Sequence, residues 1–452
     1  MGLQEKIRNL QEVENKFSIN SSGETLSLRL KKIDEIKKDI HGRLIEELSD
    51  IIFRKNISDN ELKTKVSASA QHHVFENDFP LTHEEKSRII SEIIDDIVGF
   101  GPIEEFLRDK DVTEIMVNNP STIYIEKFGK IVRASKTFLD ENHLMRIIDK
   151  IVSKIGRRVD ESSPYVDARL PDGSRVNIII NPLVLNGPTM TIRKFSADPF
   201  KIDDLIRMGT CSRKTADFLR SCVIGRINIL VSGGTGTGKT TMLNVLSSFI
   251  PNDERIITIE DAAELQLNQH HVIRVESRPP NIEGKGEVSI RDLVRNALRM
   301  RPDRIIVGEV RGGETLDMLQ AMNTGHDGSL STVHANSPRD VLSRLETMVL
   351  MAGVDLPIRA IREQVASAIN LIIHLNRMKD GTRKIVKVVE VQGMEGEIIT
   401  LQDIFVYDYS PGLDEKGKYK GDIKATGLRP KFLARLHDYG INLPNAIFME
   451  EL

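Results

Sequence analysis

The sequence predicts an α/β protein: a largely parallel β-sheet covered by helices, preceded by an α+β domain and an N-terminal helical region. Beyond about residue 210, strand-like and helix-like segments alternate along the chain. Short apolar runs such as INILV and RIIVG are typical of strands buried on both faces. A glycine-rich loop between a strand and a helix completes the pattern. A length of 452 residues, 40% of them hydrophobic, is enough for two or three domains.

The first predicted element is the helical region, residues 1–80. In LSLRLKKIDEIKKDIHGRLIEELSDIIF the apolar residues recur every three or four positions, which predicts an amphipathic helix. A membrane-surface or coiled-coil role is the alternative to a small helical bundle. The charges on this segment mix both signs, which favours packing on neighbouring helices.

The second element is an α+β domain, residues 81–197. It starts with a capped helix at Leu81-Thr82-His83-Glu84-Glu85. EIMVNNPSTIYIEKFGKIVR predicts strands with Asn-Pro and Phe-Gly turns, and a helix follows over ENHLMRIIDKIVSKIGR. ARLPDGSRVNIII and TMTIRKF return to strand, with Pro171-Asp172-Gly173 as a turn.

The third element is the parallel-sheet domain, residues 211–452. A linker at 198–210 precedes it, and the boundary lies near Asp198. From about Asn376 onward we expect a small C-terminal extension of antiparallel strands and a short helix.

Composition and charge exclude several classes of protein. A net charge of −3 does not suggest a dedicated nucleic-acid binder. Cys211 and Cys222 form no CxxC pair, so neither a disulfide framework nor a structural zinc site is supported and a reducing cytoplasm fits. No apolar run approaches the roughly 20 residues that cross a bilayer, and the first residues lack a signal-peptide hydrophobic region. Any membrane association is therefore expected to be peripheral.

The glycine-rich loop predicts a nucleotide site, because it matches GxxxxGK[ST] directly after INILV and before TMLNVL. Its backbone N–H groups would cradle the phosphates of a nucleoside triphosphate, Lys239 would reach the outer phosphates, and the Thr240 hydroxyl would ligate Mg²⁺. A coincidental glycine-rich turn is the alternative. The expected nucleotide-binding residues are Gly233, Gly234, Thr235, Gly236, Thr237, Gly238, Lys239, Thr240 and Thr241.

Two acidic strand ends are candidates for the hydrolytic chemistry. Glu309 follows the buried-type strand RIIVG and is the first choice for activating water. Glu260 ends the strand RIITIE, and a helix N-cap or a surface acid is its alternative role. Since parallel sheets place ligands at the carboxyl ends of strands, both carboxylates are expected near the phosphates.

Four stretches together resemble a known family. GGTGTGKTT, TIEDAAEL, NALRMRPDRIIVGEVRGGE and GHDGSLSTVHANSPRD are similar to the Walker A, Asp, Walker B and His boxes of the secretion ATPase superfamily, which drives type II and type IV secretion and type IV pili. The resemblance covers about residues 112–375, and the sequences of these motifs are most similar to those of the Tad (Flp) pilus branch, the CpaF-like ATPases.

The resemblance implies a RecA-like ATPase core and a PAS-like α+β domain, assembled as cytoplasmic homohexamers at the inner face of the membrane. ATP and Mg²⁺ are the implied cofactors, and inner-membrane pilus platform proteins the implied partners. Arg175 and Arg193 match the family's phosphate-sensing arginines, with Arg169 as runner-up. If a mobile domain carries the cation, hydrolysis depends on the closing of that domain over the bound ATP. Pairing with surface acids is the alternative for each arginine.

The chain also departs from parts of that superfamily. No cysteine follows Cys222, so the four-cysteine zinc module of type II secretion and pilus-extension ATPases is absent. His326 and His334 stand one residue further apart than the two box histidines of retraction motors. We therefore assign a role only to His334, as a sensor of the γ-phosphate, and expect His326 to be structural.

The predicted function is an ATP-hydrolysing motor that assembles a Tad-type pilus, and the shared motifs do not distinguish extension of the pilus from retraction or from both. One alternative is a type IV secretion (VirB11-like) ATPase that translocates protein or DNA. Another is a nucleic-acid motor, although no basic-aromatic channel pattern supports it and no nucleic-acid partner is expected. A non-catalytic scaffold would lack Glu309 or Lys239, and the sequence has both.

Overall fold

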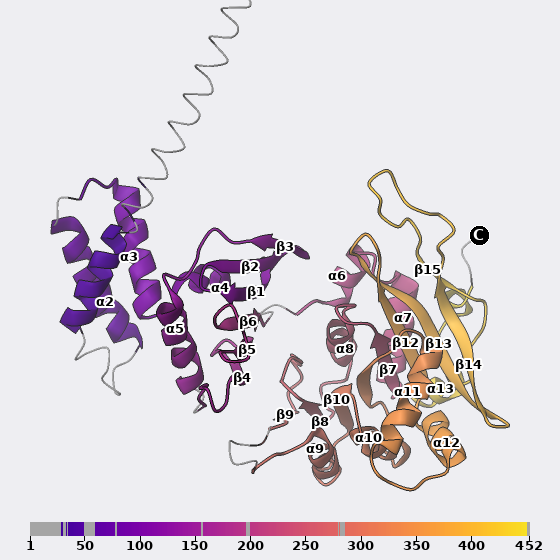
Figure 1. Ribbon diagram of the computed structural model, residues 1–452. Helices are drawn as coiled ribbons and strands as arrows, with labels where there is room; N and C mark the ends of the chain where they lie inside the picture. The colour runs from indigo at the N-terminus through magenta and orange to yellow at the C-terminus, as the bar shows by residue number, and fades with distance from the viewer. Residues whose placement is uncertain are drawn as a thin grey trace, which may run out of the picture. The chain divides into compact units, whose positions relative to one another are not determined.

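The computed structural model describes residues 29, 33, 35–48, 59–76, 79–154, 157–195, 199–278, 280 and 285–449. The chain forms two compact units, Met1–Phe195 and Ser196–Leu452 (Figure 1). The expected boundary at Asp198 and parts of the expected helix before residue 59 lie outside the described residues. Among the described residues, no helix is both long enough and apolar enough to cross a membrane.

The first unit begins with helices that share one apolar core. Helical residues 35–48 pack with α2 (Asp59–Glu76) and α3 (His83–Ile97). Ile40, Val66 and Ile93 are among the buried residues of this core. The core therefore extends through α3, past the boundary expected at residue 80, because the apolar face of α3 is buried against the preceding helices.

A capping box starts α3, as the sequence predicts. The Thr82 side chain accepts a hydrogen bond from the Glu85 backbone N–H at 3.2 Å, and the Thr82 N–H donates to Glu85 Oε2 at 2.8 Å. These two bonds satisfy N–H groups that the helix itself leaves unpaired.

The rest of the first unit is an antiparallel sheet and the helix α5 (Glu141–Lys154), which share one apolar core. The short helices η1 (Gly101–Ile103) and α4 (Glu104–Arg108) precede the first strand of the sheet. The strand order is β3-β2-β1-β6-β5-β4. Alternate residues such as Ile115, Val176 and Ile192 point to one side and share a core with the apolar face of α5. The strands are β1 (Val112–Asn119), β2 (Thr122–Lys127), β3 (Lys130–Arg133), β4 (Tyr165–Arg169), β5 (Arg175–Ile179) and β6 (Thr189–Arg193).

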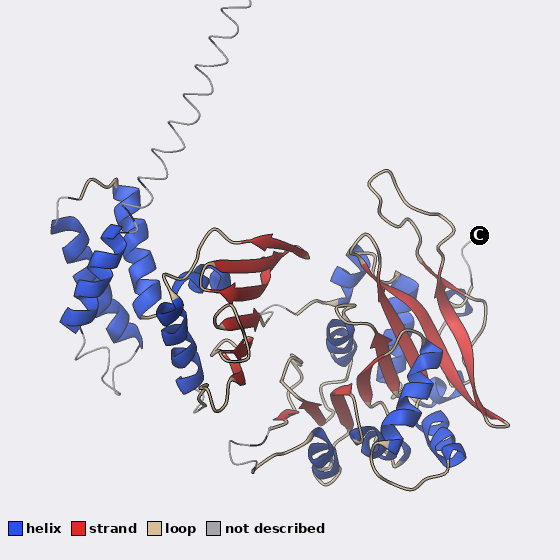
Figure 2. Ribbon diagram, in the orientation of Figure 1, coloured by secondary structure: helices blue, strands red, loops and turns tan. Residues whose placement is uncertain are grey.

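The second unit is built on one nine-stranded sheet in the order β15-β14-β13-β12-β7-β11-β10-β8-β9. Figure 2 shows its strands in red and the surrounding helices in blue. The six strands from β12 to β9 pair in parallel, and β12 to β15 pair antiparallel. The strands are β7 (Ile229–Gly233), β8 (Ile256–Glu260), β9 (Val272–Glu276), β10 (Arg304–Val310), β11 (Leu330–His334), β12 (Leu371–Arg377), β13 (Arg383–Glu395), β14 (Ile398–Tyr407) and β15 (Ile423–Ala425).

Two apolar cores cover the two faces of this sheet. Ile229 and Val231 of β7 belong to the core with α7 and α8, whereas Leu230 belongs to the core with α9 to α12. A strand buried on both faces explains the continuous apolar run INILV. The helices are α6 (Ile202–Arg207), α7 (Arg213–Ile224), α8 (Lys239–Ser247), α9 (Ile290–Ala297), α10 (Glu314–Asn323), α11 (Pro338–Leu350), α12 (Ile358–Ala368), α13 (Leu433–Asp438) and the 3-10 turn η2 (Asn445–Ile447).

Two expectations about this unit need correction. Residues 202–207 of the expected linker form α6, because Leu205 is buried in the core beside α7. The antiparallel strands and the short helix expected after about Asn376 are present as β13 to β15 and α13, but the strands belong to the main sheet, because Val388 of β13 and Phe405 of β14 are buried in the same core as β7.

Candidate nucleotide site

The sheet brings four predicted sequence features to one edge. The glycine-rich loop follows β7, His334 ends β11, Glu309 lies near the end of β10 and Glu260 ends β8. These strands are neighbours in the order β7-β11-β10-β8, and His334 pairs directly with Gly233. Because all four strands are parallel, their carboxyl ends meet at the same edge. The structure therefore confirms the predicted placement of these residues.

The loop itself has the backbone that its glycines require. A Cβ at Gly233 would lie 2.5 Å from the Leu375 carbonyl oxygen, so only glycine fits there. Gly238 has a φ of 93°, in the left-handed region that favours glycine. Thr237 Oγ1 and Lys239 Nζ both donate to the Gly234 carbonyl, at 2.9 and 3.0 Å. These contacts therefore fix the backbone conformation of the loop at the start of α8.

Lys239, His334 and Glu309 form a contiguous cluster of ionisable side chains. The two ring nitrogens of His334 lie 3.2 and 3.4 Å from Lys239 Nζ, and His334 Nε2 lies 2.9 Å from Glu309 Oε1. The imidazole therefore lies between an ammonium and a carboxylate. A change in the charge of a phosphate bound at Lys239 would therefore change the electrostatic environment of His334 directly.

Arg311 holds the other oxygen of the Glu309 carboxylate. Its Nη2 donates to Glu309 Oε2 at 2.7 Å, and its Nη1 lies 3.6 Å from Asp261 Oδ2. The hydrogen bond to Glu309 raises the pKa of Arg311. Sequence reasoning missed this residue, although it stands two positions after Glu309 in the Walker B-like stretch.

Burial lowers two pKa values in the cluster. Loss of solvent is the largest cause of the lowered pKa of Lys239, with Glu309 acting in the opposite direction. Burial also lowers the pKa of His334, against the opposing effect of Glu309. His334 is therefore neutral at pH 7, able to accept or donate a hydrogen bond.

Glu260 is a buried carboxyl group, only 4% exposed. Its Oε2 accepts hydrogen bonds from the backbone N–H groups of Glu264 and Leu265, at 2.7 and 3.0 Å. Its Oε1 is buried and has no hydrogen-bond partner within the described part of the chain. Burial raises the pKa of Glu260 to about 7. This carboxyl group is neither a surface acid nor a helix cap, because no helix follows it.

The residues present fit a Mg²⁺–nucleotide. Thr240 and Thr241 lie in the first turn of α8, directly after Lys239. Mg²⁺ in nucleotide sites takes most of its ligands from phosphates and water, so one hydroxyl and one or two carboxyl groups are sufficient. The unpartnered Oε1 of Glu260 is the kind of oxygen that such a site leaves available. No cluster of three or more potential ligands among His, Cys, Asp and Glu occurs in the described ranges.

The predicted arginines lie in the first unit, in one row across its sheet. Arg175 of β5 pairs in register with Arg169 of β4 on one side and Arg193 of β6 on the other. Residues directly opposite one another share a face of the sheet. The structure thus places the three arginines side by side in the first unit, whereas the nucleotide loop belongs to the second unit.

His326 is separated from the site by the length of β11. It precedes the strand, whereas His334 ends it, so the two histidines lie at opposite edges of the sheet. The His326 carbonyl accepts a hydrogen bond from Ser329 Oγ at 2.8 Å. His326 is therefore not part of the candidate nucleotide site.

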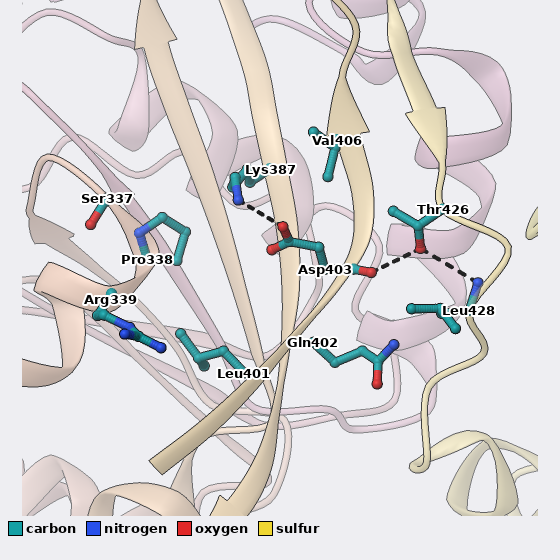
Figure 3. Close-up of a pocket in the computed structure, with 10 residues that line it drawn as sticks. All are labelled: Ser337, Pro338, Arg339, Lys387, Leu401, Gln402, Asp403, Val406, Thr426 and Leu428. Carbon is teal, nitrogen blue, oxygen red and sulfur yellow. Dashed lines mark hydrogen bonds and ion pairs between the residues drawn. The ribbon is translucent and has the colours of Figure 1, made fainter. Parts of the chain in front are cut away.

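A separate open pocket of about 600 Å³ lies between the start of α11 and strands β13 and β14 (Figure 3). Lys387 and Asp403, which form an ion pair of 2.7 Å, and Arg339 line part of it. None of the predicted catalytic or nucleotide-binding residues lines this pocket.

Comparisons with known proteins identify the family of the chain. Residues 96–400 match the family described as type II/IV secretion system protein. A putative conjugal transfer protein of Mycobacterium tuberculosis is 34% identical over 326 residues, which cover 71% of this chain and 91% of that protein. The type IV secretion system protein VirB11 of Bartonella henselae is 33% identical over 320 residues, covering 62% of this chain and 88% of that protein.

Among solved structures, the pilus retraction motor PilT with bound ADP matches at a TM-score of 0.48 and 22% identity, covering 63% of this chain and 80% of that one. The VirB11 ATPase of Brucella suis matches at a TM-score of 0.35 and 29% identity, covering 64% and 94%.

Proposed function

Because the chain belongs to the family of type II/IV secretion system proteins, we propose that it is an ATP-hydrolysing motor of a membrane secretion or pilus machine. The observation that carries this proposal is the cluster of Lys239, His334 and Glu309 beside the glycine-rich loop. A phosphate-binding loop alone would bind nucleotide, whereas a carboxylate at the same strand edge can also direct a water molecule to the γ-phosphate.

Each residue has a distinct part in the proposed reaction. The loop N–H groups and Lys239 bind the phosphates, and Thr240 holds Mg²⁺, which supplies positive charge to the phosphate oxygens. Glu309 orients and deprotonates the attacking water, with its second oxygen fixed by Arg311. The unpartnered oxygen of Glu260 would be available to Mg²⁺ or its bound water, and His334 would sense loss of the γ-phosphate through Lys239.

The sensing role of His334 follows from its contacts. A γ-phosphate at Lys239 would draw the ammonium towards it and away from the imidazole. Release of the phosphate returns the ammonium to His334, and α11 begins only four residues later. His334 can therefore report the state of the nucleotide to α11.

Cooperation with the first unit is part of the proposal. We assign the second unit as a RecA-like core and the sheet of the first as PAS-like, with Arg175 and Arg193 as donors of positive charge to the ATP of a hexameric ring. Their register on neighbouring strands supports a joint role. ATP would favour a closed arrangement, and hydrolysis would remove the contacts that hold it closed.

The machine that this motor serves is assigned from the sequence. We propose assembly of a Tad-type pilus through an inner-membrane platform protein, on the similarity of its motifs to that branch. A type IV secretion ATPase is the second candidate, which the relatives described as conjugal transfer and VirB11 proteins favour. Neighbouring genes separate the two, since prepilin and prepilin peptidase genes indicate a pilus, and coupling-protein and relaxase genes indicate secretion.

The experiment that tests the motor role is Lys239→Ala in the native host. We expect loss of pilin fibres, because the outer phosphates lose their only loop cation. Fibres at normal length and number would refute the pilus role, and loss of conjugal transfer with intact fibres would favour the secretion alternative.

A further inference from the structure

The hairpin between β12 and β13 reaches the glycine-rich loop from a distant part of the chain. β12 runs parallel to β7, with Leu375 opposite Gly233, and continues past the end of that strand. Arg377 and Arg383 are paired in register on the two strands of the hairpin, at the level of the loop. Neither residue belongs to the four motifs on which the proposed function depends.

Arg383 is bonded to the loop backbone. Its Nε donates to the Gly236 carbonyl oxygen at 2.9 Å, across 147 residues of sequence. A Cβ at Gly238 would lie 3.4 Å from Arg383 Cδ, so the stem of the arginine also lies against the loop. Arg377 Nη1 is 3.8 Å from the position of a Cβ at Gly236. Both side chains therefore lie beside Gly236, and Arg383 also lies beside Gly238.

Peptide geometry gives this bond a consequence for nucleotide binding. In a trans peptide the carbonyl of Gly236 and the N–H of Thr237 point in opposite directions. A loop of this kind binds phosphates with its N–H groups, so its carbonyls must face outwards. By holding the Gly236 carbonyl, Arg383 keeps the Thr237 N–H turned towards the phosphate side.

The hairpin is anchored well enough to hold Arg383 in place. Its turn is closed by Asp380, whose Oδ1 accepts from the Thr382 N–H at 2.9 Å and whose Oδ2 accepts from the Tyr419 N–H at 3.0 Å. Met378 is buried against Tyr407 and Tyr419. Buried Lys384 donates to the Gly209 carbonyl at 2.6 Å. Arg383 is exposed, but the backbone that carries it is fixed on several sides.

Charge adds to the geometric argument. Within the part of the chain that the structure describes, neither Arg377 nor Arg383 pairs with a carboxylate. Two uncompensated cations beside a phosphate-binding loop lower the cost of bringing a polyphosphate to it.

We propose that Arg383 is a positioning residue of the nucleotide site, which fixes the phosphate-binding conformation of the loop, and that Arg377 assists it through its charge. This inference rests on the proposed function, because it concerns the same nucleotide. It differs from the catalytic roles, since Arg383 acts through the loop backbone that binds the α- and β-phosphates. The expected effect is on affinity for ATP and ADP alike, and not on the chemical step.

The test compares Arg383→Met, Arg383→Lys and Arg359→Met in the full-length protein. Arg359 is a matched control, an exposed arginine on α12 whose bond is to Glu363. We expect Arg383→Met to weaken binding of fluorescent ATP and ADP by about tenfold, the value of one charge-assisted hydrogen bond near solvent. Arg383→Lys should recover most of that loss because it restores a donor.

The KM for ATP should rise with the dissociation constant, while kcat at saturating ATP stays within about twofold. The melting temperature without nucleotide should match that of Arg359→Met. Unchanged affinity in Arg383→Met would overturn the inference and leave the proposed function intact. A fall in kcat at unchanged affinity would also overturn it. Absence of ATP binding by the wild-type protein would overturn both.

Discussion

At the scale of single residues, one neutral imidazole connects the phosphate-binding lysine to the hydrolytic carboxylate. His334 contacts both Lys239 and Glu309, and burial keeps it uncharged. A general base in this position would compete with Glu309, whereas a neutral group between two charges responds to either of them. The contacts therefore favour sensing over catalysis.

Removing His334 should separate binding from turnover. We expect His334→Ala to keep its ATP dissociation constant within about threefold and to lose at least about tenfold in kcat, the size of one lost interaction that is made during turnover. Equilibrium binding and steady-state phosphate release measure the two quantities. Wild-type kcat in this variant would contradict the sensing role.

The buried carboxyl of Glu260 should make activity depend on pH near neutrality. Its pKa of about 7, raised by burial, leaves only about a tenth of it ionised at pH 6. If the ionised form is required, kcat/KM for ATP should rise about fivefold from pH 6 to 7 and level off above about pH 8, at about tenfold its value at pH 6. Glu260→Gln should be less active and should lose this rise. A wild-type profile that is flat over the same range would exclude the requirement.

At the scale of elements, the turn between α10 and β11 supports the strand that carries His334. Gly328 lies there beside Arg304, which is fully buried and bonded to Glu254 at 2.5 and 3.0 Å. The Asn228 side chain accepts hydrogen bonds from the N–H groups of Gly328 and Ser329. This turn is therefore part of a buried polar network at the edge of the sheet opposite the nucleotide site.

Two glycines three positions apart provide a matched test of that network. A Cβ at Gly328 would collide with the Arg304 guanidinium, so Gly328→Ala should cost at least about 3 kcal/mol by disturbing a buried ion pair. At Gly325 the φ is also positive, at 94°, but nothing lies within 4 Å, so Gly325→Ala should cost about 1 kcal/mol of backbone strain. Denaturant unfolding measures both free energies. Equal losses of stability in the two variants would contradict this reading of the turn.

The elements also show what sequence patterns could and could not predict. The strand before the glycine-rich loop, the helix after it and the capping box at Thr82 follow from local rules, and the structure contains them. The order β7-β11-β10-β8 depends on pairing between distant strands, which periodicity does not encode. Arg383 was missed for the same reason, because 147 residues separate it from Gly236. Part of the expected linker is helical because Leu205 is buried in the core, and this burial cannot be read from the local sequence.

At the scale of the whole molecule, the two units are stabilised differently. The second has two large apolar cores around one sheet. In the first, the helical region and the α+β part meet at a buried polar cluster. There His143 of α5 lies 3.8 Å from Asp96 of α3, and Lys37 lies 3.1 Å from the same carboxylate. The His41 ring is 6.5 Å from that of His143.

Acid should therefore weaken the first unit. Burial lowers the pKa values of both His41 and His143. The carboxylate of Asp96 raises these two pKa values, whereas the positive charges of Arg146 and Lys37 lower them further. Both rings are neutral when folded, so their contribution is fully present above about pH 6.5 and is lost as the pH falls below it, because the unfolded chain binds the protons more readily.

Amide hydrogen exchange between pH 7.5 and 5.5, corrected for the intrinsic exchange rate, measures this loss of stability in the first unit. Protection of α5 and of residues 35–48 should fall by up to about 1.4 kcal/mol per pH unit for each histidine. His41→Gln should reduce the slope, and His72→Gln, at a mostly exposed ring, should leave it unchanged. Protection that rises towards pH 5.5 would contradict this account.

The central claim is that this chain hydrolyses ATP with Glu309 at the carboxyl edge of its sheet. The direct measurement is Mg²⁺-dependent phosphate release by the purified wild-type protein and by Glu309→Gln, alongside ATP binding by both. We predict steady release by the wild type, a loss of at least about a hundredfold in Glu309→Gln, and ATP affinity unchanged within about threefold. Equal rates of phosphate release by the two proteins would contradict the claim.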